Sequence, residues 1–168
     1  MSAAEIDLRF TLNGREVQAR VPSHTLLLDL VRERFGLKGS KRSCDMEVCG
    51  ACTMMLDGNL VSSCTTLAAD ADGRAVVTVE GLTPAAGLSR VQEALVLHGA
   101  VQCGFCTPGF VVAITHLLQQ HPNADDEQIR RHLRGNLCRC TGYVKILAAV
   151  RSLAGTEPGL QPLAHERT

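Results

Sequence analysis

Aromatic residues are scarce in this 168-residue chain, where they make up 3% of the sequence, and tryptophan is absent. Apolar residues account for 45% and charged residues for 20%, which is typical of a folded protein with a core of leucine, valine, isoleucine and alanine. The length suits one ordinary domain or two small ones. Two small domains would each have a thin core that needs additional stabilisation by a cross-link or a bound metal.

Charge of one sign is also lacking, because 17 Lys and Arg residues balance 17 Asp and Glu residues. A neutral chain has no basic excess to attract nucleic acid or an anionic membrane. The first seven residues do not resemble a secretory signal, and the longest apolar stretch, residues 110–118, falls short of the ~20 residues of a membrane span. We therefore expect a soluble, cytoplasmic protein whose partner is another protein or a small molecule.

No glycine-rich phosphate loop and no G-x-S-x-G segment occurs in the sequence, so nucleotide binding or hydrolysis by this chain has no support. Cysteine, by contrast, is abundant, with eight residues. Cytosolic thiols are kept reduced, so cysteines in this number favour metal ligation over disulfides.

The first half of the chain predicts a small mixed sheet with one helix. Apolar residues alternate with polar ones on both sides of Asn13-Gly14 and of Asp57-Gly58, which is typical of hairpins closed by tight turns. The predicted elements are a hairpin over 6–21, a helix over 26–31 capped by Ser23 or Thr25 and ended by Gly36, a hairpin over 53–63 and a strand over 76–79.

From about residue 83 the apolar pattern becomes helical, and no strand is predicted after Glu80. The first of four predicted helices contains Leu88, Val91 and Leu95, and the second begins at Thr107-Pro108. The third begins within 123–126 and stops at Gly135, and the fourth begins with Thr141 as its cap. Four short helices suggest a bundle. The sequence thus predicts domains at 1–82 and 83–155 and a flexible tail at 156–168.

The first four cysteines have the spacing C-x4-C-x2-C-x11-C and are Cys44, Cys49, Cys52 and Cys64. The first three reproduce the plant-type ferredoxin spacing for a [2Fe–2S] cluster. Four thiolates must surround a compact rhomb of two irons and two sulfides, so three come from a tight loop and the fourth from a separate element. Gly50 lets the backbone curl close to the cluster, and Ala51 leaves room beside it.

The second four cysteines have the spacing C-x2-C-x31-C-x-C and are Cys103, Cys106, Cys138 and Cys140. Each pair lies just before a predicted helix, so two helix N-termini are expected to converge on one site. Their dipoles and free N–H groups stabilise an anionic cluster. Four basic residues flank the cysteine sets and are expected to help in the same direction: Lys38, Lys41, Arg42 and Arg139.

Two other uses of the cysteines are less well supported. Structural zinc also takes four cysteines, but usually as C-x2-C pairs 15 to 20 residues apart, and disulfides conflict with the expected compartment. Four histidines, His98, His116, His121 and His132, have no ligand-spaced partner and are expected at surfaces or helix ends.

Three segments carry a family resemblance: residues 44–53, 102–109 and 135–143. The second reads QCGFCTPG and the third GNLCRCTGY. Together they resemble the small iron–sulfur subunit of the xanthine oxidase family of molybdenum hydroxylases. The resemblance covers about residues 5–155.

That family implies an α+β fold with a β-grasp, ferredoxin-like domain at 1–82 and a four-helix-bundle [2Fe–2S] domain at 83–155. It implies two partners, a large molybdopterin subunit and a medium FAD subunit, expected as a dimer of heterotrimers. Substrate would be oxidised at molybdenum, and electrons would pass through the C-terminal and then the N-terminal cluster to FAD. By similarity, Gln102 and Cys140 lie against the pterin, and this chain carries no catalytic residue.

A free-standing two-cluster ferredoxin is the alternative function. Such a carrier would be a monomer with an acidic docking face, whereas this chain is neutral and carries Gln102. In either case the substrate site belongs to another chain. Carbon monoxide, a purine, an N-heterocycle, an aldehyde and an aromatic thioester are all compatible with this sequence.

Overall fold

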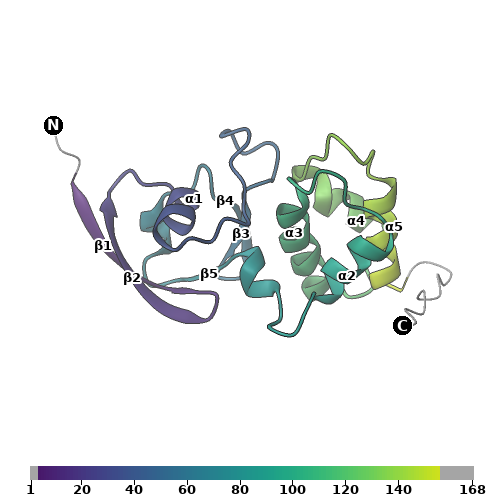
Figure 1. The fold of residues 1–168 in the computed structure, drawn as a ribbon, viewed down its shortest axis with the longest axis horizontal. Coiled ribbons are helices and arrows are strands. Elements are labelled where there is room, and N and C mark those ends of the chain that lie inside the picture. The colour runs from purple at the N-terminus through teal and green to yellow at the C-terminus, as the bar shows by residue number, and fades with distance from the viewer. Residues whose placement is uncertain (1–3, 156–168) are drawn as a thin grey trace, which may run out of the picture.

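The computed structural model describes residues 4–155, with a sheet at one end of the molecule and a group of helices at the other (Figure 1). Among these residues the sheet has five strands in the order β2-β1-β5-β3-β4. Their bounds are β1 (Glu5–Leu12), β2 (Arg15–Pro22), β3 (Thr53–Leu56), β4 (Asn59–Ser62) and β5 (Ala75–Val77). The sheet is mixed, because β1 pairs parallel with β5 while the other pairs are antiparallel.

Both predicted hairpins are confirmed. Asn13 and Gly14 have φ of 50° and 78°, and Asp57 and Gly58 have φ of 48° and 77°, as two-residue hairpin turns require. The predicted strand over 76–79 is shorter than expected, since β5 ends at Val77 and a 3-10 turn, η3 (Val79–Leu82), follows.

The first helix is α1 (Leu27–Asp29), which continues as a π-helical turn, η1 (Leu30–Arg34). The predicted cap is wrong: the N-cap is Leu26, which makes no side-chain cap bond, and the Thr25 hydroxyl instead donates to the Pro22 carbonyl at 2.7 Å. Four residues of this segment are completely buried: Leu27, Leu28, Leu30 and Val31. Apolar burial therefore holds the helix in place without a cap.

The second half is helical, as predicted, with α2 (Arg90–Leu97), α3 (Thr107–Gln120), α4 (Asp126–His132), the 3-10 turn η4 (Leu133–Gly135) and α5 (Val144–Leu153). Ser89 and Gln92 form a capping box on α2, so Leu88 lies outside the helix and is 49% exposed. No helix in the described part of the chain is long and apolar enough to cross a membrane.

Helix α3 begins at Thr107, as predicted, whereas α5 begins later than predicted. The N-cap of α3 is Cys106, with Thr107 and Pro108 in its first turn. The N-cap of α5 is Tyr143, which has a left-handed backbone with φ of 68°, so Thr141 does not cap the helix. The predicted tail over 156–168 lies outside the described residues.

Strand β3 connects the two halves because both of its faces are buried. Met54 and Leu56 belong to the core beneath the sheet, whereas Met55 belongs to the core of the helices. Helix α3 lies beside β3 (Figure 1). A mixed sheet packed directly against helices is therefore the confirmed part of the predicted fold.

A second contact joins the cysteine loop to the helices through glycines. A Cβ atom added to Gly109 of α3 would lie 2.1 Å from the Gly50 carbonyl oxygen, and one added to Gly50 would lie 2.2 Å from the Gly135 carbonyl oxygen. The buried Asn136 amide donates to the Gly50 carbonyl at 3.2 Å. Backbone thus packs on backbone, and Gly50 is required for this contact as well as for the loop turn.

We predict that Gly109→Ala destabilises the protein by about 1 to 3 kcal/mol, because the new methyl group collides with a carbonyl that cannot rotate away. Thermal unfolding measures this as a Tm lower by several degrees. Gly135→Ala is the matched control, since an added Cβ there meets no atom within 4 Å. Equal Tm values for the two variants would contradict the glycine contact.

Candidate metal centres

The first cysteine set lies in the loop between η1 and β3 and at the end of β4. Cys52 and Cys64 are buried, whereas Cys44 and Cys49 are partly exposed. The buried Ser63 hydroxyl donates to the Cys52 carbonyl at 2.6 Å, which fixes the start of β3 against the residue before Cys64. The structure therefore brings a tight loop and a separate element together, as the spacing predicts.

Backbone N–H groups of the loop converge on the Cys44 sulfur. The N–H groups of Met46, Val48 and Cys49 lower the pKa of this thiol from 9.0 to about 6, and the Cys49 N–H lies 3.4 Å from it. Asp45 and Glu47 have left-handed backbones with φ of 52° and 61°, which turns successive N–H groups toward one side as in an anion-binding nest. The loop is shaped to hold a thiolate.

The second cysteine set is formed by the loops that precede α3 and α5. The Sγ atoms of Cys103 and Cys140 lie 3.6 Å apart, and Cys106 and Cys138 contact one another through their side chains. Burial raises the pKa of Cys106 to about 12. Each sulfur pair therefore takes one cysteine from the loop before α3 and one from the loop before α5.

The sulfur spacing fits two thiolates on one iron. All eight cysteines are free thiols, and 3.6 Å far exceeds a disulfide bond of about 2.05 Å. Two sulfurs at tetrahedral positions with metal–sulfur bonds of about 2.3 Å would lie about 3.8 Å apart. Within the described residues, no three His, Cys, Asp or Glu side chains converge on a point for a single metal ion; the sulfurs approach in pairs, as two bridged irons need.

Thr141 has a role that the sequence did not reveal. Its hydroxyl donates to the Cys138 sulfur at 3.1 Å and its N–H does so at 3.4 Å. Burial acts to raise the pKa of Cys138, but the hydrogen bonds, those from Thr141 foremost, outweigh it and hold this pKa below its ordinary value. The Cys138 N–H donates to the Tyr143 hydroxyl at 3.0 Å.

The two cysteine sets are joined by one backbone hydrogen bond. The Leu137 N–H donates to the Cys49 carbonyl at 2.9 Å, and Leu137 directly precedes Cys138. A cavity of about 580 Å³ is lined by cysteines of both sets, among them Cys49, Cys106, Cys138 and Cys140. The structure therefore places the two sets side by side.

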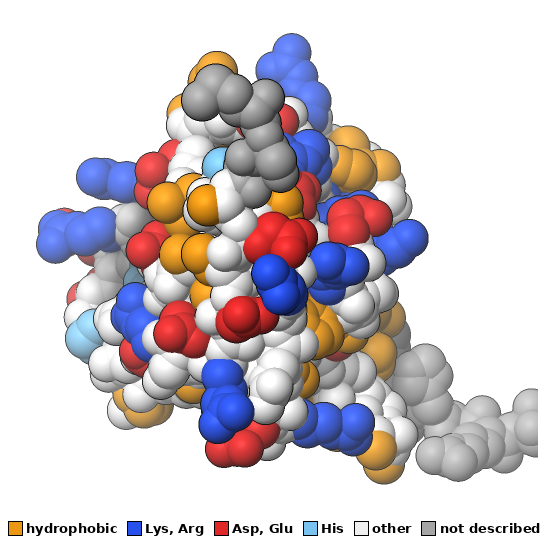
Figure 2. All heavy atoms as spheres, turned by 90° about the vertical axis from the view of Figure 1, so that its left-hand side faces the viewer, with side chains coloured by type: hydrophobic (Ala, Val, Ile, Leu, Met, Phe, Trp, Pro, Cys, Tyr) orange, Lys and Arg blue, Asp and Glu red, His pale blue; other side chains and the backbone are white. Residues whose placement is uncertain are grey.

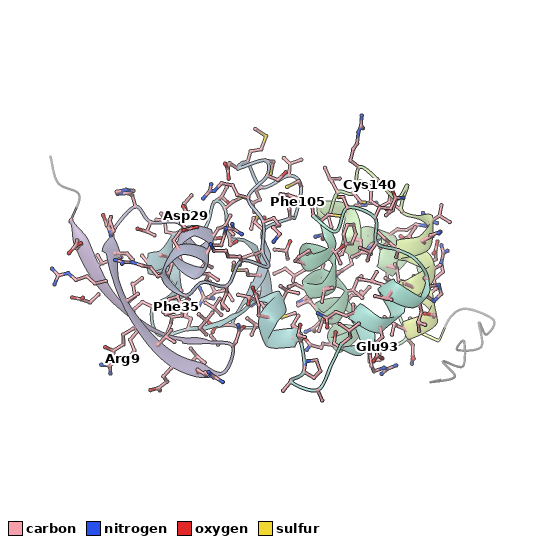
Figure 3. All side chains as sticks on the ribbon, viewed as in Figure 1. Arg9, Asp29, Phe35, Glu93, Phe105 and Cys140 are labelled. Atoms are coloured by element: carbon pink, nitrogen blue, oxygen red, sulfur yellow. The ribbon has the colours of Figure 1, made fainter. Side chains whose placement is uncertain are left out.

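Gln102 and Cys140 lie together at the surface. The Gln102 amide donates to the Cys140 carbonyl at 3.2 Å. Cys140 and Phe105 lie along the same edge of the molecule (Figure 3), and the Phe105 side chain is 46% exposed. This edge of the second cysteine set is accessible to a partner.

The predicted basic surroundings are weaker than expected. Arg42 forms ion pairs with Asp29 and with Asp45, the latter at 2.6 Å, so its charge is balanced within the chain. The Lys41 ammonium donates to the Lys38 carbonyl at 2.6 Å and ties the loop to itself. Arg42 therefore adds little net positive charge, whereas Lys41 keeps its charge and holds the loop in shape.

Two histidines form a pair that their sequence positions did not indicate. The rings of His116 and His132 stack with centroids 5.1 Å apart, and a nitrogen of one lies 3.3 Å from a nitrogen of the other. The pair links α3 to the end of α4.

Comparison with known proteins agrees with this arrangement. Residues 10–82 match the family described as the 2Fe-2S iron-sulfur cluster binding domain, and residues 78–151 match the [2Fe-2S] binding domain family. The chain is 47% identical to the nicotine 6-hydroxylase small subunit of Paenarthrobacter nicotinovorans over 90% of both chains. It is 43% identical to the nicotinate dehydrogenase small FeS subunit of Eubacterium barkeri, over 88% of this chain and 94% of that protein.

Among solved structures, quinoline 2-oxidoreductase from Pseudomonas putida 86 is similar, with a TM-score of 0.87 and 38% identity over 90% of this chain and 94% of that one. The chain belongs to the xanthine oxidase family of molybdenum hydroxylases, as an iron–sulfur subunit. This subunit transfers electrons and carries two [2Fe–2S] clusters. The zinc alternative is therefore wrong, and the family resemblance seen in the sequence is confirmed.

The pKa of Cys44 gives a pH-dependent prediction for the iron-free subunit. Above about pH 6 Cys44 is a thiolate, which is the nucleophilic form, so iodoacetamide should alkylate it first, with a half-maximal rate near that pH. Burial raises the pKa of Cys52 to about 12, so this thiol is the internal control and should remain unmodified. Mass spectrometry of alkylated peptides measures both, and a half-maximal rate for Cys44 near pH 9 would contradict the loop geometry.

The Thr141 hydrogen bond predicts a shift in reduction potential. The bond favours the reduced, more negative cluster, so Thr141→Val should lower the potential of the second cluster by about 40 mV, which corresponds to ~1 kcal/mol for one electron. Thr141→Ser keeps the hydroxyl and should keep the potential. Redox titration followed by EPR measures both variants, and an unchanged potential in Thr141→Val would show that the hydroxyl does not act on the cluster.

Proposed function

We propose that this subunit relays electrons from a molybdopterin centre on a large subunit through its C-terminal and then its N-terminal cluster to FAD on a medium subunit. The complex is a cytoplasmic dimer of heterotrimers. The observation that carries the proposal is the hydrogen bond from the Leu137 N–H to the Cys49 carbonyl, 2.9 Å long. It provides a short, continuous connection from a residue beside Cys138 to a member of the other cysteine set.

The ligands of each cluster follow from the two groups of sulfur atoms. Cys44, Cys49, Cys52 and Cys64 hold the first cluster, and Cys103, Cys106, Cys138 and Cys140 hold the second. Each [2Fe–2S] cluster, when bound, takes up and releases one electron. The chain itself supplies thiolates, hydrogen bonds to their sulfurs from Thr141 and from the loop N–H groups, and a fixed separation between the two sites.

The order of the relay is supported by what each site exposes. Cys103 and Cys140 are exposed, with Gln102 beside them, so this edge meets the molybdopterin subunit, and Gln102 and Cys140 lie nearest the pterin. The loop of the first set exposes Met46 and Val48, which are 66% and 52% accessible, and offers an apolar surface to the FAD subunit. The two partners thus contact two different loops of this chain.

We also propose that the halves of the chain are two cluster-binding domains that meet near residue 82. The first is a β-grasp domain, supported by the mixed five-stranded sheet of the described residues. The second is a four-helix bundle, supported by the shared core of α2 to α5. The inner face of β3 and the Gly50 contact hold the domains together.

The experiment purifies the native complex through a tag on this chain and measures iron, molybdenum, flavin and the EPR spectrum after dithionite reduction. We expect two distinct [2Fe–2S] signals together with copurified molybdenum and flavin. In Cys138→Ala, the C-terminal signal should be lost and the N-terminal signal retained, and Cys64→Ala should give the reverse. Two signals from a lone chain would favour a free carrier, and loss of both signals in either variant would refute two separate sites.

A further inference from the structure

Charge is unevenly distributed along this neutral chain. On the sheet end of the molecule, basic and acidic side chains are interspersed (Figure 2), and ion pairs such as Arg20 with Glu5 and Arg74 with Asp57 form there. Residues 128–155, by contrast, contain no acidic residue. Their basic residues are Arg130, Arg131, Arg134, Arg139, Lys145 and Arg151.

Three of these arginines line an open cavity of about 550 Å³ between the end of α4 and α5: Arg130, Arg134 and Arg151. Arg130 and Arg151 share one carboxylate, that of Asp126, at 2.6 Å and 2.7 Å from their Nε atoms. Arg134 forms no ion pair with any residue in the described part of the chain. Arg134 therefore carries a positive charge at this cavity that no carboxylate of residues 4–155 balances.

The other walls of the cavity are apolar. Leu133 and Leu147 line it, and so does Val144, the first residue of α5, whose side chain is 72% exposed. A site with apolar walls and arginines at its rim suits a peptide segment that carries both kinds of side chain better than a free inorganic ion.

The cavity is continuous with the edge of the second cysteine set. Leu137 and Tyr143 line both this cavity and the one that contains the cysteines, and Leu137 is 46% exposed. A partner that covers Cys140 and Phe105 therefore reaches the arginines without leaving the surface of this subunit.

We propose that the arginine cavity binds an acidic segment of the molybdopterin subunit, with at least one carboxylate on Arg134 and an apolar residue against Val144 and Leu147. The identity of the partner rests on the proposed function. Arginine binds a carboxylate through two parallel N–H···O bonds, and Arg134 is available for this. The interaction sets the orientation of the subunit over its second cluster, because opposite charges at an interface fix register.

The test uses the complex purified through a tag on this chain and measures how much large subunit is retained as KCl is raised. In Arg134→Glu we expect affinity to fall about tenfold or more, so that the large subunit is released at lower KCl. Val144→Asp should also weaken binding, because it adds a negative charge beside the arginines. The fold should be preserved, because an acidic residue in the first turn stabilises a helix. Arg15→Glu, the same charge reversal on the sheet, is the matched control and should behave as wild type.

The outcomes separate this inference from the proposed function. If the wild-type chain copurifies with molybdenum and Arg134→Glu holds the large subunit to the same KCl concentration, the acidic segment is refuted while the relay stands. If the wild-type chain copurifies with no large subunit, the proposed function itself fails. The effect of inorganic phosphate on the Tm of the wild type and of Arg134→Glu gives a further outcome. If phosphate raises the Tm of the wild type but not of Arg134→Glu, while Arg134→Glu still retains the large subunit, the cavity is a small-anion site and the inference is overturned. Unchanged EPR signals in every variant confirm that both clusters are intact.

Discussion

The backbone contact at Gly50 is the constraint on which the arrangement of the two sites depends. Gly50 lies between Cys49 and the start of β3, and its carbonyl is covered by Gly109 of α3 and by the amide of Asn136. A side chain at either glycine would separate the two halves. Because Asn136 is followed by Leu137 and Cys138, the same contact that joins the halves also positions the second cysteine set against the first.

Hydrogen bonds to sulfur are the second requirement, since thiolates in a thin core need dipoles beside them where a neighbouring basic side chain is already paired. Arg42 is balanced by Asp29 and Asp45. Loop N–H groups therefore stabilise Cys44, and Thr141 stabilises Cys138. Fixed donors of this kind need no reorganisation when the charge of the cluster changes by one electron, which suits a protein that transfers electrons.

Features encoded by adjacent residues could be predicted from the sequence, and features that depend on distant contacts could not. The turn at Asn13-Gly14 and the grouping of eight cysteines follow from local spacing. The sequence predicts Thr141 as a helix cap, because its contact with the Cys138 sulfur exists only in the folded loop. The pairing of His116 with His132 depends on how α3 meets α4, and the requirement for Gly109 depends on a carbonyl 59 positions earlier in the chain, at Gly50.

We infer that the two clusters are held close together and are connected through Cys49 and Leu137. Low-temperature EPR of the fully reduced protein tests it directly, because two paramagnetic centres at short distance split one another's signals. We expect splitting in the fully reduced protein that disappears when one cluster is oxidised. A spectrum equal to the simple sum of two independent signals would contradict it.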